Sequence, residues 1–115
     1  MTLNMVINAL KELAGNIKPV LIAEKAGSVS ANTNIFDDFS VPDSGYIIVQ
    51  IGSDTAGYPI VVINGQSYAL NQQNNLTTNS IYEFWMVVTS EDTLNVQFSA
   101  DANVLIRVFY VGGGV

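Results

Sequence analysis

The 115-residue sequence predicts an all-β fold, an antiparallel β-sandwich or barrel of about eight strands after a short N-terminal α-helix. Hydrophobic residues recur with helical spacing before Gly15, and from Ile17 onward they follow the two-residue period of strands. Turn-forming residues then recur at roughly 8–12-residue intervals, as they do in sandwiches and barrels. The chain contains no cysteine, so its single domain must depend on a hydrophobic core, which a chain of this length can bury.

The first predicted element is a helix over residues 2–14, with Thr2 as its cap and Gly15 as its stop. Its apolar stripe consists of Leu3, Val6, Leu10 and Leu13. A helix this short is marginal alone in water, so we expect the stripe to be buried on its own domain or on a neighbouring subunit. We therefore divide the chain into an N-terminal arm, residues 1–16, and a β-sandwich domain, residues 17–115.

The predicted strands are residues 20–23, 28–30, 46–51, 59–63, 66–70, 81–89, 93–99 and 104–111, and residues 34–40 carry the apolar side chains Ile35, Phe36 and Phe39. Asn64-Gly65 is a strong hairpin signal, and the polar residues 71–80 form the best candidate for a long loop. Residues 104–111 are apolar on both faces except at Arg107. We expect this strand to be covered on both sides or to lie in an interface.

The composition lacks the side chains on which most enzymatic catalysis depends. There is no histidine for acid–base work near neutral pH, no thiol nucleophile, and only one arginine. The adjacent acids Asp37-Asp38 and Glu91-Asp92 would point to opposite faces of a strand, so neither pair converges. No phosphate-binding or nucleophile-elbow motif is present. We predict that the protein is not an enzyme and binds no cofactor.

The charge balance narrows the possible partners. The net charge of −6 would repel nucleic-acid phosphates and anionic membranes. The longest apolar runs, such as 59–63 and 84–88, are far too short to span a bilayer, and the N-terminus lacks a signal-peptide layout. Only 12% of residues are charged, so we expect neighbours in an assembly to cover part of the surface. The alternative is an acidic, Asn- and Thr-rich extracellular domain.

The sequence contains candidate residues for two kinds of ligand site, a calcium site and a carbohydrate site. Asp37, Asp38 and Asp43 lie close in sequence and could be joined by Asp54 or Asp101 in a calcium site, but ordinary turn aspartates explain them better. We therefore predict no metal site. A carbohydrate would need an aromatic platform with nearby amides, for which the candidates are Tyr58, Tyr68, Asn74 and Asn75.

Three single residues carry further expectations. Tyr58, between Gly57 and Pro59, is predicted to be the most exposed aromatic residue. Trp85 lies in an apolar strand and is predicted to be in the core. Arg107 should pair with a carboxylate such as Glu83 or Asp101, within the chain or across an interface.

As a pattern, the acidic chain with a short arm and Asn/Thr-rich loops resembles the small jelly-roll decoration, cement and spike proteins of phages and other icosahedral viruses. The resemblance implies a jelly-roll-like sandwich, a homo-oligomer with a trimer favoured, other capsid proteins as partners, and a place on the virion surface. The predicted interface residues are Leu3, Val6, Leu10, Leu13, Arg107, Phe109 and Val111. The alternative function is a glycan- or receptor-binding module, such as a fibre or adhesin head, outside the cell.

Overall fold

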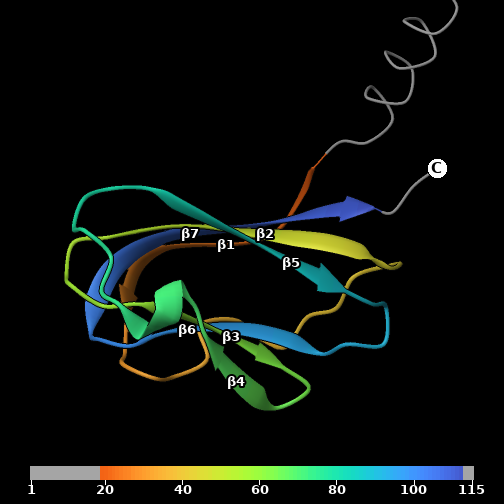
Figure 1. The fold of residues 1–115 in the computed structure, drawn as a ribbon, viewed down its shortest axis with the longest axis horizontal. Helices are drawn as coiled ribbons and strands as arrows, with labels where there is room; N and C mark the ends of the chain where they lie inside the picture. Colours follow the sequence, from red (N-terminus) through yellow and green to blue (C-terminus); the bar gives the residue numbers. More distant parts are fainter. Residues whose placement is uncertain (1–18, 113–115) are drawn as a thin grey trace, which may run out of the picture.

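The computed structural model describes residues 19–112, which form an antiparallel β-sandwich of seven strands in two layers (Figure 1). The strands are β1 (Val20–Val29), β2 (Gly45–Ser53), β3 (Pro59–Ile63), β4 (Gln66–Ala69), β5 (Tyr82–Val88), β6 (Leu94–Phe98) and β7 (Ala102–Gly112). A four-stranded sheet has the order β1-β7-β2-β5, and a three-stranded sheet has the order β4-β3-β6. The prediction of an all-β antiparallel sandwich is confirmed. The predicted N-terminal helix lies outside the described residues.

The core lies between the two sheets and follows the two-residue period of the strands. In the four-stranded sheet, every second residue of β2 and β7 faces inward. These side chains are Ile47, Val49, Ile51, Val104, Ile106, Val108 and Tyr110. The three-stranded sheet contributes Val61, Leu94, Val96 and Phe98. Since each of these residues is at most 8% exposed, the sandwich has one continuous hydrophobic core.

Two local details explain how the strands are connected. Asn64 and Gly65 both have positive φ, 53° and 80°, as a two-residue type I′ hairpin requires, and they join β3 to β4 as expected. Residues 20–23 and 28–30 were predicted as separate strands, but they form the single strand β1. Gly27 lies between these two segments at φ 142°, a backbone conformation that glycine adopts readily, and the strand continues through it.

The segment between β1 and β2, which includes residues 34–40, is not a regular strand. It runs along the edge of β6, where the backbone N–H groups of Asn32, Ile35 and Phe39 donate to the carbonyls of Phe98, Val96 and Leu94 at 2.7, 2.9 and 3.0 Å. Only Phe39 forms a β-bridge, with Leu94. The segment therefore covers the edge of the three-stranded sheet without becoming a regular strand.

Asn95 is the reason that this segment is irregular. Its side chain is 1% exposed, and its Oδ1 accepts from the backbone N–H groups of Phe36 and Val96 at 3.1 and 2.9 Å. Its Nδ2 donates to the carbonyl of Phe36 and to Oδ1 of Asp38 at 2.7 and 2.9 Å. One buried amide thus takes the place of a strand ladder at Phe36.

We predict that Asn95→Ala lowers the free energy of unfolding by about 2–3 kcal/mol, because it leaves buried backbone groups of Phe36 without partners. Gln97→Ala is the matched control, since Gln97 donates one exposed hydrogen bond to Asn34, and it should cost about 0.5–1 kcal/mol. Urea unfolding measures both. Equal losses for the two variants would show that Asn95 does not hold the segment.

Two exposed aspartates fasten the loops at opposite ends of the sandwich. Asp54 accepts from the backbone N–H of Asn103 at 2.9 Å and from its side-chain amide at 3.1 Å, and these bonds lower the pKa of the Asp54 carboxyl from its ordinary 3.8. Asp92 accepts from the backbone N–H of Thr89 and from the amide of Asn64, each at 2.9 Å, and its pKa is lowered for the same reason.

A carboxyl whose pKa is lower in the folded state stabilises the fold above its unfolded pKa, and this contribution is lost as the pH falls through the folded pKa. We therefore predict that stability falls below about pH 4, and that Asp54→Asn with Asp92→Asn flattens this fall. Urea unfolding from roughly pH 5 to pH 2 measures it. Asp37→Asn controls for net charge, and an unchanged slope in the double variant would contradict the prediction.

Candidate functional site

The outer surface of the four-stranded sheet carries two cross-strand rows of apolar residues. Register aligns Leu21 of β1 with Phe109 of β7, Ile48 of β2 and Trp85 of β5. The adjacent row aligns Val111, Tyr46 and Val87. We call this surface the apolar face, and it consists of Leu21, Tyr46, Ile48, Trp85, Val87, Phe109 and Val111.

The apolar face is exposed at its margins and packed at its centre. Trp85 is 60% exposed and Val87 70%, whereas Ile48 in the middle of the sheet is 7% exposed. The rings of Tyr46 and Trp85 meet edge to face, with centroids 6.3 Å apart. Large aromatic and aliphatic side chains therefore lie side by side at the surface of residues 19–112.

A polar row borders the apolar face. Glu24, Arg107, Gln50 and Glu83 lie opposite one another across the four strands, and Arg107 lies two residues before Phe109 on β7. The carboxylate of Glu24 lies 3.8 Å from Nε of Arg107, and Nε2 of Gln50 donates to Oε1 of Glu83 at 3.3 Å. The row supplies both signs of charge at one side of an otherwise apolar surface.

Arg107 pairs with a carboxylate, as expected, but its partner in the chain is Glu24 and neither of the named candidates, Glu83 and Asp101. Register places Glu24 directly opposite Arg107, and Gln50 lies between Arg107 and Glu83. Asp101 instead accepts a hydrogen bond from the backbone N–H of Ala31 at 2.7 Å. Both side chains of the Glu24–Arg107 pair are more than 40% exposed, so the pair orients the charges more than it stabilises the fold.

A β-bulge in β1 puts Leu21 and Glu24 on the same surface. The register shifts between Leu21 and Ala23, so that these residues pair with the consecutive residues Phe109 and Val108. Without the extra residue, positions three apart on a strand would face opposite sides. The bulge therefore completes both the apolar row and the polar row at the edge of the sheet.

The prediction that Trp85 lies in the core was wrong. On β5 the inward positions belong to Tyr82, Phe84, Met86 and Val88, which places Trp85 on the outer surface. The expectation that Tyr58 is the most exposed aromatic residue was also wrong. Tyr58 is half-buried, while Tyr46 and Tyr68 are 45% and 49% exposed.

The predicted ligand-binding residues lie at the other sheet. Tyr68 is on β4, and its hydroxyl donates to Oε1 of Gln66 at 2.9 Å. The backbone N–H of Tyr58 donates to Oγ of Ser99 at 2.8 Å. Asn74 and Asn75 are exposed and follow a short 3₁₀ turn, η1 (Asn71–Gln73).

The turn η1 is unusual because its residues Asn71, Gln72 and Gln73 all have positive φ, at 54°, 53° and 62°. Non-glycine residues rarely adopt this left-handed conformation, and three in succession are held by the bonds around them. The N–H of Leu70 donates to the carbonyl of Pro59 at 2.9 Å, and that of Leu76 to the carbonyl of Gly57 at 2.7 Å. These bonds fix the amide-rich loop beside Tyr58.

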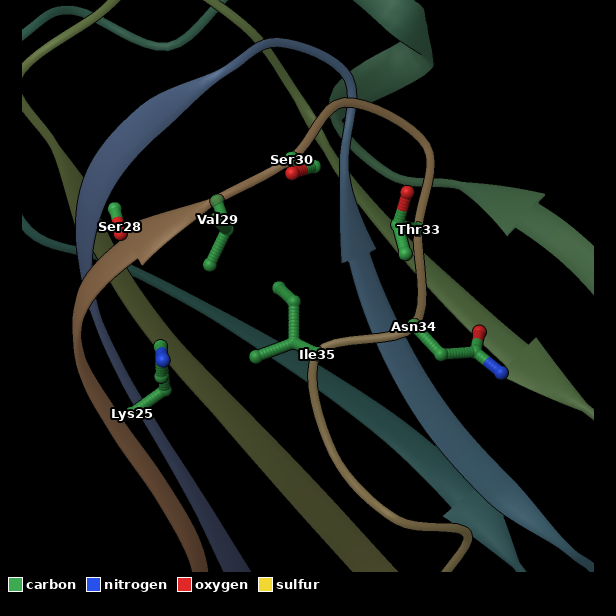
Figure 2. Close-up of a pocket in the computed structure, with 7 residues that line it drawn as sticks. All are labelled: Lys25, Ser28, Val29, Ser30, Thr33, Asn34 and Ile35. Carbon is green, nitrogen blue, oxygen red and sulfur yellow. The ribbon is translucent and has the colours of Figure 1, made fainter.

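A cavity of about 190 Å³ lies between β1 and the following loop, where Figure 2 shows Lys25 and Val29 on β1 and Ile35 on the loop. Lys25 opposes the buried Ile106 in register, and an inward charge of this kind protects an edge strand from pairing. A second cavity, of about 420 Å³, lies beside Asp54, Asn79 and Asn103.

Across residues 19–112 no three acidic side chains lie close enough to hold a metal ion. The same residues contain no helix of the length and apolar character that crossing a membrane demands.

Four members of the apolar face, namely Leu21, Tyr46, Ile48 and Val87, were not among the predicted interface residues, and Trp85 was predicted to lie in the core. The sequence identified Phe109 and Val111, together with Arg107 in the polar row. For Tyr46, Ile48 and Val87 the sequence did contain a signal, because residues 46–51 and 81–89 have apolar side chains at both odd and even positions and so on both faces of the strand. The other predicted interface residues, Leu3, Val6, Leu10 and Leu13, lie outside the described residues.

No protein-family model, curated protein or solved structure matches this chain.

Proposed function

We propose that the protein is a non-enzymatic structural protein that self-associates through the apolar face and decorates or caps a larger assembly, of which a viral capsid is the leading candidate. The observation that carries the proposal is the apolar face itself. Trp85, Val87, Tyr46 and Leu21 are each 45% exposed or more, and they lie in two adjacent rows. Covering these side chains in a contact between copies would be strongly favourable.

The strand order supports the jelly-roll part of the proposal. If the segment that runs along β6 is counted as an irregular second strand, the sheets read 1-8-3-6 and 2-7-4-5. This is the order of two Greek keys wrapped into a jelly roll, the architecture of many viral capsid proteins and of some lectins. Cupins share it, but a chain without histidine lacks their usual metal ligands.

The polar row suggests how the contact is oriented. Glu24, Arg107 and Glu83 stand at one side of the apolar face, so a neighbouring copy must place complementary groups there. Charges at the rim of an interface contribute to register and specificity more than to affinity. The apolar rows would then supply the binding energy, and the polar row would select a single arrangement.

We predict that light scattering on a sizing column gives the full chain a mass that is a discrete multiple of one chain. Tyr46→Ser combined with Val87→Ser should shift it toward the mass of a single chain, because both side chains lose apolar contact area in the interface. A single-chain mass for the unmodified protein at high micromolar concentration would refute self-association.

Tyr68→Ser is the matched control for this experiment. Tyr68 and Tyr46 are the same residue type with 49% and 45% exposure, but Tyr68 belongs to the other sheet. The control should leave the mass of the oligomer unchanged. If Tyr68→Ser dissociated the oligomer as strongly as the Tyr46 variant, the interface would not be the apolar face.

The second candidate function is a carbohydrate- or receptor-binding module, and the left-handed turn η1 favours it. Backbone strain of this kind is held at binding sites more often than elsewhere, and the turn presents exposed amides near Tyr58. Neutral sugars are bound by aromatic rings together with amide groups, which this loop supplies.

This candidate predicts binding on a glycan array that is lost in Asn74→Ala with Asn75→Ala. Both residues are exposed, so the variant should keep the stability of the parent protein, and urea unfolding verifies that. Tyr46→Ser should retain binding because Tyr46 lies on the other sheet. An array without signal would remove the candidate and leave the structural role.

A further inference from the structure

The apolar face needs a cover with particular properties. Four strands spaced by about 4.8 Å give the sheet a width of about 14 Å between β1 and β5. The cover must place apolar side chains over two adjacent rows and tolerate the acidic groups of the neighbouring polar row, Glu24 and Glu83.

Residues 2–14 of the same chain have these properties. A helix of thirteen residues would be about 20 Å long, enough to cross all four strands. Its predicted stripe of Leu3, Val6, Leu10 and Leu13 is apolar along its whole length. Gly113, Gly114 and Val115, which follow β7, offer no such stripe.

Charge is compatible with this segment as the cover. Lys11 and Glu12 cancel within residues 1–16, so the arm carries no net side-chain charge. Glu24 and Glu83 border the apolar face, and they would not repel a segment of this kind.

The chain leaves the fold beside the apolar face. Strand β1 begins at Val20, and Leu21 is already part of the first apolar row. Residues 15–19 connect this point to the predicted helix and reach at most about 17 Å when extended. The arm is therefore tethered within reach of this surface on its own copy or on an adjacent one.

Pro19 favours the adjacent copy. A proline restricts the residue before it to extended conformations, so the chain should continue past Val20 in the direction of the strand. Only residues 15–17 then remain to reverse it onto its own sheet, a span of about 10 Å. An arm that continues outward meets a neighbour without this reversal, as in exchanged-segment oligomers.

We propose that residues 2–14 of one copy form a helix that docks through Leu3, Val6, Leu10 and Leu13 on the apolar face of a neighbouring copy. This inference rests on the proposed self-association and specifies its joint. Arm and face are different surfaces, so two copies can exchange arms about a two-fold axis, or the contact can run head to tail around a closed ring, of which a trimer is one form.

The single tryptophan provides a direct test, because Trp85 lies in the apolar face. One full-length variant carries Val6→Ser and Leu10→Ser, which interrupts the stripe, and keeps Trp85 as its reporter. A second full-length variant carries Trp85→Ser, has an intact arm and contains no tryptophan. The emission maximum and acrylamide quenching of Trp85 are measured for the first variant alone and after addition of the second.

The proposal expects Trp85 to be shielded in the unmodified protein, exposed in the arm variant, and shielded again when the tryptophan-free chain is added. Asn4→Ser with Asn8→Ser is the control, since both positions lie opposite the stripe on a helix, and it should keep the shielding. Circular dichroism verifies that all variants retain the β-sandwich.

Two results would overturn the proposal. Equal quenching of Trp85 in the unmodified protein and in the arm variant would mean that the arm does not cover the face. If the native mass remained a multiple of one chain, self-association would survive that result. Shielding in a protein with single-chain mass, without rescue on mixing, would mean that each arm covers its own face, and self-association would fail as well.

Discussion

The antiparallel pairing of β2 with β7 is the constraint on which the rest of the structure depends. It joins Gly45 to Gly112 and Ser53 to Val104, residues far apart in the sequence, and places both strands at the centre of the four-stranded sheet. This register turns Val49 and Val108 together into the core. Because such contacts are almost entirely long-range, the sheet can form only when the two halves of the chain meet.

The same register determines the outer surface. Once the core positions of β2 and β7 are fixed, the residues between them must face outward, and in this chain Ile48 and Phe109 are apolar as well. An isolated domain with one wet face would carry polar residues there. The polar row of Glu24, Arg107 and Glu83 limits the apolar surface on one side. Under the proposed self-association, the sheet has the core on one side and a contact surface on the other.

The sequence alone was sufficient for most strands, because alternation and the Asn64-Gly65 hairpin are local signals. It was insufficient for the orientation and the contacts of side chains, because these depend on which strands are neighbours. The orientation of Trp85 required knowing which side of β5 faces the core, and the partner of Arg107 required the register of β1 against β7. The course of the segment before β2 was not predicted, because no local pattern shows that the distant Asn95 binds its backbone.

The central claim is that the apolar face is covered by another copy, and the emission of Trp85 in the full chain over a dilution series tests it most directly. Trp85 is 60% exposed in the single chain, so our account predicts short-wavelength emission at high concentration and a shift to longer wavelengths as copies separate. Long-wavelength emission that is unchanged up to the highest concentration would contradict it, because the face would then remain in contact with water.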